Sequence, residues 1–171
     1  WQQLREKTHG VDMWTQIVSS PLQRCALFAD EVAQRCSKSL SVMEGFREVD
    51  FGDWEGRLIA DVWREQGSNA RHFFADPVNA APPNGEPMPV FEQRVLAAWH
   101  QLLQSMRGEH VLLVAHGGTI RVLLAHVLAM PLNRIASLDV PYASASRIRV
   151  HHSAEHSDFS TLVFHNSRFL E

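Results

Sequence analysis

The sequence predicts an α/β fold in which helices cover both faces of a mostly parallel sheet, and three observations support this class. Short apolar runs alternate with longer segments whose apolar residues recur at helical spacing, an order typical of such sheets. Residues 111–114 form a continuous apolar run, as strands covered on both faces do. Polar residues directly follow two predicted strands, at 19–24 and 115–118, where folds of this class bind their ligands.

In the first half of the chain, local sequence patterns predict two strands, the end of one helix and two further helices. Ser20 and Pro21 are interpreted as the cap and first residue of a helix whose apolar side chains continue at helical spacing to about Arg35. In chain order, the prediction is a helical end over 1–7, a strand over 15–19, this helix, a strand over 40–43, an irregular segment over 45–56 and a short amphipathic helix over 58–66.

The second half begins with a long loop over 76–89, which holds five prolines, two asparagines and one glycine. Loops of this length commonly act as lids or binding loops, so we expect substrate selection between 58 and 89, with Glu86 in the pocket wall. After the loop, the prediction is a helix over 90–106, a strand over 111–114, a helix over 119–130 and two strands over 145–150 and 161–164.

Length and composition bound the class of protein. A chain of 171 residues with 45% apolar and 20% charged residues suits one domain, 1–171. A net charge of −3 argues against a broad nucleic-acid surface and favours a small-molecule partner. No apolar run is long enough to cross a membrane and no signal-peptide pattern opens the chain, so we expect no membrane partner and a cytoplasmic location. The sequence leaves a homodimer open.

The segment Val-Ala-His-Gly-Gly-Thr at 114–119 is the strongest candidate for a binding site. His116 is expected at the carboxyl end of a buried strand, and Gly117 and Gly118 permit a sharp turn into a helix. The free N–H groups and positive dipole end of that helix favour an anion. A tight turn capped by a histidine without a ligand explains the same residues, so other residues must decide.

Two further segments supply candidate partners for an anion. Arg24 lies in the first turn of its helix, and its side chain leans toward the same edge of the sheet, where it can hold a phosphate. Residues 46–56 alternate carboxylates with aromatic residues, an environment that raises the pKa of a carboxyl and suits it to donate a proton. Spacing alone does not decide which carboxylate does so; the four candidates are Glu48, Asp50, Asp53 and Glu55.

Four motifs in order resemble the histidine phosphatase superfamily, which has the phosphoglycerate-mutase-like fold. They are Ser-Ser-Pro-Leu-Gln-Arg at 19–24, Glu-Val-Asp-Phe-Gly-Asp-Trp-Glu-Gly at 48–56, Gly-Glu at 85–86 and Val-Ala-His-Gly-Gly-Thr-Ile-Arg at 114–121. The resemblance spans nearly the whole chain and implies a three-layer αβα sandwich around a mostly parallel sheet.

The resemblance also implies roles. Arg24 and His116 match the residues that bind the phosphoryl group, with His116 as the second, supporting histidine and with the backbone N–H of Gly117 as a further phosphate ligand. Glu48 matches the acid that protonates the leaving oxygen. The implied chemistry needs no metal or cofactor. His151 and His152, with His156, are interpreted as a solvated hairpin turn rather than a metal site.

One departure from the family is serious. The family begins with a strand that ends in Arg-His-Gly, whose histidine is the nucleophile, and residues 1–171 contain no such sequence. His9 is no substitute, because it lies between the predicted first helix and the predicted first strand. We therefore expect the first strand and the nucleophile upstream of Trp1, and residues 1–171 alone to lack the covalent step.

These observations predict a metal-independent phosphatase that hydrolyses a small phosphorylated metabolite through a phosphohistidine. The short acid segment and loop resemble the small phosphatase branch, such as the α-ribazole phosphatases, so α-ribazole 5'-phosphate is a candidate substrate. A phosphoglycerate mutase is the alternative enzyme. A pseudoenzyme that binds a phosphorylated ligand without catalysis is the alternative of another class.

Overall fold

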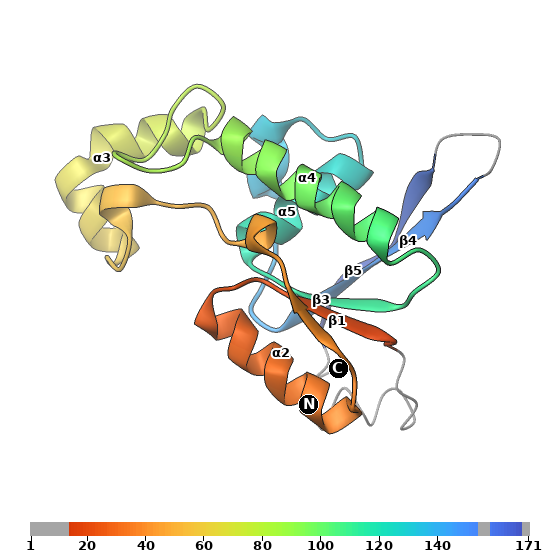
Figure 1. Ribbon diagram of the computed structural model, residues 1–171. Coiled ribbons are helices and arrows are strands. Elements are labelled where there is room, and N and C mark those ends of the chain that lie inside the picture. The colour runs from red at the N-terminus through yellow and green to blue at the C-terminus, as the bar shows by residue number, and fades with distance from the viewer. Residues whose placement is uncertain (1–13, 154–157, 169–171) are drawn as a thin grey trace.

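The computed structural model describes residues 14–153 and 158–168 (Figure 1). The helix predicted over 1–7, His9 and His156 lie outside the described residues. The strands are β1 (Gln16–Ser19), β2 (Leu40–Val42), β3 (Val111–Val114), β4 (Ser144–His151) and β5 (Phe159–Arg168). The α-helices are α2 (Gln23–Cys36), α3 (Ile59–Ala75), α4 (Met88–Ser105) and α5 (Gly117–Val127), and the 3-10 helices are η1 (Glu44–Phe46), η2 (Gly52–Trp54) and η3 (Leu132–Ser137).

A three-stranded parallel sheet in the order β2-β1-β3 forms the centre of the fold. Ser19, the last residue of β1, pairs with Val42 in β2 and with Val114 in β3. The backbone continues this alignment beyond the strands, because the Ser20 N–H donates to the Val114 carbonyl at 3.0 Å. The segments that follow β1 and β3 therefore open on one edge of the sheet, as the sequence predicts.

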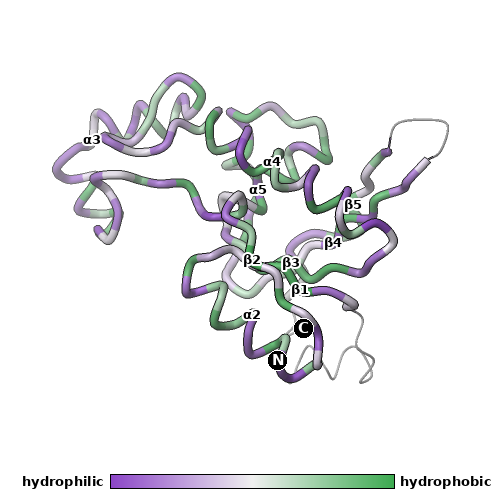
Figure 2. Tube along the Cα trace, in the orientation of Figure 1, coloured by the Kyte–Doolittle hydropathy of each residue, from purple (hydrophilic) through white to green (hydrophobic). Residues whose placement is uncertain are grey.

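Helices cover both faces of this sheet, with α2 on one side and α4 and α5 on the other (Figure 1). Ile17 and Val18 are adjacent in β1 and point to opposite faces, and each is 0% exposed. Ile17 packs in a cluster with α2, whereas Val18 belongs to the larger cluster that includes α4 and α5. Figure 2 shows the apolar character of these central strands. The predicted three-layer α/β class is confirmed.

The last two strands form a separate antiparallel hairpin, β4-β5, rather than further strands of the parallel sheet. The predicted strands are therefore present and longer than expected. At the hairpin end His152 Nδ1 lies 2.6 Å from Asp158 Oδ2, and the His151 ring stacks on Phe159. These contacts agree with the interpretation of His151 and His152 as hairpin residues.

The predicted start of α2 is wrong. Its first helical residue is Gln23 and its N-cap is Leu22, which makes no side-chain capping bond. Ser20 is fully buried, and its hydroxyl accepts a hydrogen bond from the Leu22 N–H at 3.3 Å as well as lying beside the ring of His116. Ser20 therefore keeps a local bond to the backbone ahead of the helix, and the helix itself begins three residues later.

The helix predicted over 58–66 continues to Ala75 as α3, across a break at Gln66 (φ −127°, ψ 34°). The side chain of Gln66 accepts a hydrogen bond from Trp54 Nε1 at 2.9 Å. Beyond the break, Ala70 and Phe73 are buried, and this packing explains why the helix resumes. Within the part of the chain that the structure describes, no helix combines the length and apolar character that a membrane span requires.

Candidate functional site

His116 lies between β3 and α5, as the N-cap residue of α5, and is only 6% exposed. Its Nδ1 accepts a hydrogen bond from Arg24 Nε at 3.0 Å. Its Nε2 lies 2.6 Å from the hydroxyl of Ser20. Residues from the two strand-to-helix segments, 92 positions apart for Arg24 and His116, are thus joined at one edge of the sheet.

These partners determine the tautomer of His116. The Nε of arginine carries a hydrogen and only donates, so Nδ1 of His116 is the unprotonated nitrogen and Nε2 carries the ring hydrogen. Nε2–H then donates to Ser20 Oγ. Burial, assisted by the positive charge of Arg24, lowers the pKa of His116 from 6.5 to about 4. The ring is therefore neutral near pH 7, and its one N–H is directed to the hydroxyl of Ser20.

Arg24 is exposed although its Nε–H is engaged with His116. It is the second residue of α2, and side chains of a first helical turn lean toward the helix N-terminus. An anion arriving from solution can thus meet the guanidinium at the same edge of the sheet where His116 lies.

Glu48 lies at the beginning of α5. Its Oε2 accepts a hydrogen bond from the Gly118 N–H at 3.0 Å, and its Oε1 accepts one from the Val49 N–H at 3.1 Å. The positive end of a helix dipole favours a carboxylate at such a position. Glu48 and His116 therefore flank the same helix terminus although they are far apart in the sequence.

The other three candidate carboxylates are exposed and bond within the loops. Asp50 accepts from the Gly52 N–H, Glu55 from the Phe51 N–H, and Asp53 from the side chain of Asn84. Of the four carboxylates that the sequence leaves open, only Glu48 contacts α5. Its role as an acid remains a prediction.

Gly117 is the first helical residue of α5 and directly follows His116. Its position puts its backbone N–H at the positive end of the helix, where an anion is favoured. A Cβ added to Gly117 would meet only Arg121 Nη1, at 3.3 Å. The predicted contact between its N–H and a phosphate is compatible with this placement and remains a prediction.

Sequence reasoning missed Ser20 and Cys25 as neighbours of His116. Cys25 Sγ donates to the carbonyl of Ala115 at 3.4 Å and lies 3.6 Å from both ring nitrogens of His116. Burial raises the pKa of the Cys25 thiol, so Cys25 is a neutral packing residue rather than a nucleophile. Their place in the sequence could have indicated this, because both residues lie in or next to the segment 19–24, which is predicted to meet His116 at the edge of the sheet.

Sequence reasoning also missed Arg94, which binds Glu86. Both carboxylate oxygens of Glu86 accept hydrogen bonds from Arg94, at 3.0 and 2.7 Å. Glu86 therefore binds a protein side chain, and its expected place in a pocket wall stays a prediction. Among residues 14–153 and 158–168, no group of three or more His, Cys, Asp or Glu side chains is arranged to hold a metal ion.

Comparison with known proteins gives a family match over most of the chain. Residues 2–160 match the model of the histidine phosphatase superfamily (branch 1). The chain is 29% identical over 169 residues to the adenosylcobalamin/alpha-ribazole phosphatase of Escherichia coli K12, covering 99% of this chain and 80% of that protein. It is 32% identical over 144 residues to a Citrobacter koseri protein named "Probable phosphoglycerate mutase GpmB", covering 84% of this chain and 66% of that protein.

Solved structures give the same picture. The alpha-ribazole phosphatase from Shigella flexneri superposes with a TM-score of 0.80 at 27% identity, covering 98% of this chain and 81% of that one. A mycobacterial glucosyl-3-phosphoglycerate phosphatase superposes with a TM-score of 0.81 at 26% identity, covering 97% of this chain and 84% of that one.

Proposed function

The chain is a member of the histidine phosphatase superfamily, and from this premise we propose that the full-length protein hydrolyses small phosphomonoesters through a phosphohistidine intermediate. One observation carries the proposal most directly. The paired side chains of Arg24 and His116 and the carboxylate of Glu48 meet the N-terminal end of α5 from separate parts of the chain. Phosphoryl transfer needs this combination of donors for the phosphoryl oxygens and an acid for the leaving group.

We assign the roles as follows. Arg24, His116 and the N–H of Gly117 bind the phosphoryl oxygens and stabilise their charge as the bond to the leaving oxygen breaks. Glu48, in its protonated form, gives its proton to that oxygen, and afterwards accepts a proton from the water that attacks the phosphoenzyme. All of these groups belong to the protein, and the proposed steps use no metal.

None of the roles assigned to the described residues is that of the nucleophile. The histidine that the family phosphorylates belongs to an Arg-His-Gly sequence, and residues 1–171 have none. Since His116 matches the second, supporting histidine of the family, we propose that a histidine other than His116 carries the phosphoryl group. Assays of this proposal therefore use the full-length protein.

For the substrate, we propose α-ribazole 5'-phosphate as the first candidate. The Escherichia coli and Shigella flexneri relatives support it, since both are named as alpha-ribazole phosphatases and are matched over most of their length. The mycobacterial neighbour, named for a different phosphomonoester, makes glucosyl-3-phosphoglycerate the second compound to test. The cytoplasmic location, the single domain and a homodimer stay predictions.

Two other functions compete with this proposal. A phosphoglycerate mutase is favoured by the similarity to GpmB proteins. A phospho-ligand-binding pseudoenzyme is favoured only by the missing Arg-His-Gly sequence. Each differs from a phosphatase in its product.

The test is a screen of the full-length protein against phosphorylated metabolites, with and without a bisphosphoglycerate. A phosphatase releases inorganic phosphate without isomerising phosphoglycerate, whereas isomerisation would identify a mutase. Binding of phosphate esters without turnover would identify the pseudoenzyme. We expect His116→Ala and Arg24→Ala each to lower kcat/KM by about 100-fold or more. A near-normal rate in either variant would remove that residue from the site.

A further inference from the structure

We infer that Arg94, oriented by Glu86, is a positioning residue that holds Glu48 at the N-terminal end of α5. The inference rests on the proposed function, because it concerns the residue proposed as the acid. Arg94 lies on α4, 46 positions from Glu48 in the sequence, and its guanidinium reaches the backbone of the loop that carries Glu48.

The guanidinium of Arg94 has five N–H donors, and five hydrogen bonds use them. Nε and Nη2 bind the two oxygens of Glu86, at 3.0 and 2.7 Å. Nη1 binds the carbonyls of Gly45 and Arg47, both at 3.0 Å, and Nη2 also lies 3.4 Å from the carbonyl of Glu48. A lysine has three donors on a single nitrogen and cannot reproduce this fork.

These bonds fix residues 45–48, which lie outside the sheet and so have no backbone partners in a neighbouring strand. Residues 45–48 follow β2, and all four of their carbonyls are bonded by side chains from α4 or α5. Arg94 binds the carbonyls of Gly45, Arg47 and Glu48, and the buried hydroxyl of Thr119 binds those of Phe46 and Arg47, at 3.3 and 3.5 Å. The path of the backbone at Glu48 is therefore set from outside the loop.

Glu86 is held in turn by the acidic segment. Its N–H donates to the carbonyl of Asp50 at 2.8 Å, and the Asp53 N–H donates to the carbonyl of Pro83 at 2.9 Å. A Cβ on Gly85 would lie 2.7 Å from the carbonyl oxygen of Asp50, so the two segments approach closely. Glu86 thus reaches Arg94 from a backbone that is already attached to the loop of Glu48.

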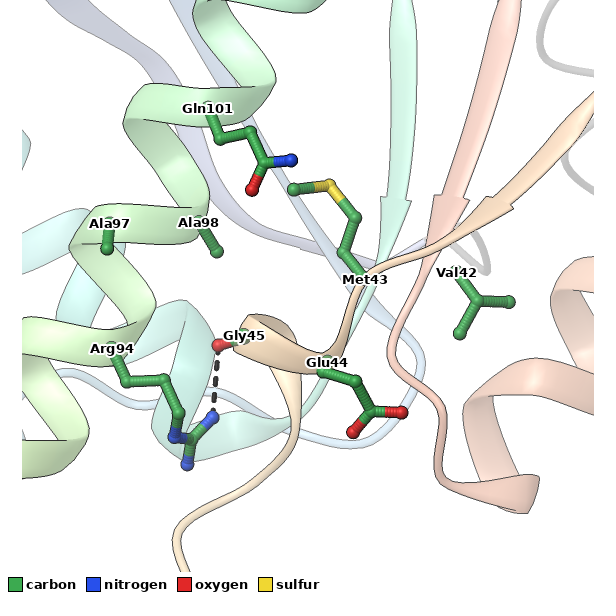
Figure 3. A pocket seen from close by; sticks show the side chains of 8 residues that line it. All are labelled: Val42, Met43, Glu44, Gly45, Arg94, Ala97, Ala98 and Gln101. Carbon is green, nitrogen blue, oxygen red and sulfur yellow. Dashed lines mark hydrogen bonds between the residues drawn. The ribbon is translucent and has the colours of Figure 1, made fainter.

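Packing holds this loop together with these bonds, since Phe46 is buried in the core and a Cβ on Gly45 would lie 2.5 Å from that of Ala98. A cavity of about 390 Å³ lies beside Arg94, between the loop and α4, and Figure 3 shows Arg94 extending from α4 to the carbonyl of Gly45 at its edge. The cavity is lined by Val42, Met43, Glu44, Gly45, Arg94, Ala97, Ala98 and Gln101. The hydrogen bonds of Arg94 are the charged restraint on this side of the loop, and they act beside the bonds of Thr119 and the packing of Phe46.

The experiment is a double-mutant cycle in the full-length protein, using Arg94→Lys and Glu48→Gln. The substrates are a primary alkyl phosphate, whose leaving oxygen needs a proton, and p-nitrophenyl phosphate, whose leaving group departs without one. We expect Arg94→Lys to lower kcat/KM on the alkyl phosphate by about 30-fold, since kcat/KM reports the transfer from substrate and not the later hydrolysis, and a misplacement of about 1 Å can cost a catalytic group up to about 100-fold. In the Glu48→Gln background, and on p-nitrophenyl phosphate, the same change should cost less than about 3-fold.

Glu86→Gln provides the second variant, since it retains the shape and backbone contacts of Glu86 while removing the charge that orients Arg94. We expect it to lower kcat/KM on the alkyl phosphate by about 5-fold, again only when Glu48 is present. Arg35→Lys is the matched control, because Arg35 pairs with Glu31 on the exposed surface of α2, and it should leave all rates unchanged.

The outcomes separate this inference from the proposed function. If Arg94→Lys and Glu86→Gln cost the same factor with and without Glu48, or on both substrates, Arg94 serves the fold alone and the inference is wrong. If Glu48→Gln leaves the rate on the alkyl phosphate intact, the acid role itself fails. If Arg94→Lys does not fold, as judged by thermal unfolding, Glu86→Gln decides by the same criterion.

Discussion

The glycine at position 118 gives the sharpest test of the contact between Glu48 and α5. Gly118 donates its N–H to Glu48 Oε2, and a Cβ added there would overlap Glu48 Oε1 and lie 3.1 Å from its Cδ. Neither atom belongs to backbone, so the carboxylate can swing away. Gly118→Ala is therefore expected to leave the fold in place and to displace Glu48 from the helix terminus.

The effect on stability should be small because two terms oppose each other. Alanine in place of glycine favours the helix by up to about 1 kcal/mol. Loss of a hydrogen bond to a charged group costs roughly 1.5–3 kcal/mol, and less here, since the half-buried carboxylate regains contact with water. The free energy of unfolding should thus change by about 1 kcal/mol or less. The rate on an alkyl phosphate should fall by about 100-fold, the lower end of what a general acid contributes.

The assay measures kcat/KM on a primary alkyl phosphate together with urea unfolding, for Gly118→Ala and Glu48→Gln side by side. Gly117→Ala is the control for stability, because it places the same methyl group one residue earlier, where it meets only Arg121 Nη1. Wild-type activity in Gly118→Ala would refute the reasoning, since the acid would then work without its place at the helix terminus. A loss of stability well above 1 kcal/mol would show that the Glu48 side chain cannot move aside as described.

Two further predictions concern His116. Its pKa of about 4 lies below the usual 6.5, so the unfolded state binds a proton more readily, and stability should fall by about 3 kcal/mol as pH decreases from 6.5 to 4. Urea titrations at several pH values should show that the free energy of unfolding falls more steeply with decreasing pH in wild type than in His116→Gln. An equal dependence on pH in the two proteins would count against a buried neutral ring. Ser20→Ala removes the acceptor of both the His116 Nε2–H and the Leu22 N–H, and should lower kcat/KM by about 10-fold in steady-state kinetics while circular dichroism shows the fold intact; an unchanged rate would mean that Ser20 does not orient the ring.

The parts of the site that follow local patterns could be predicted from the sequence. The apolar run at 111–114 and the glycines after His116 place the histidine between β3 and α5, as found. The position of Arg24 in the first turn of α2 correctly brings it to the same edge. The choice of Glu48 among four carboxylates needed the family resemblance, because all four have similar neighbours in the sequence.

What escaped prediction depends on contacts between distant residues. Ser20 has the local appearance of a helix cap, and only the fold shows that its hydroxyl also contacts His116 Nε2. Arg94 stands among the polar residues of an amphipathic helix, where an exposed arginine is the ordinary expectation, and its carbonyl partners are 46 to 49 positions away. The continuation of α3 past Gln66 similarly depends on the burial of Phe73. The helical spacing of apolar residues up to Gln66 gives no information about that contact.

The most direct test of the proposed chemistry is to trap the phosphoenzyme. Full-length protein would be mixed with a phosphomonoester labelled in its phosphoryl group, quenched within milliseconds under alkaline conditions and digested, and the labelled peptide identified by mass spectrometry. The account predicts a phosphohistidine at a residue other than His116, and less labelled enzyme when Arg24 or His116 is replaced by alanine. Phosphate release with no labelled enzyme at any time, or a label on His116 itself, would contradict it.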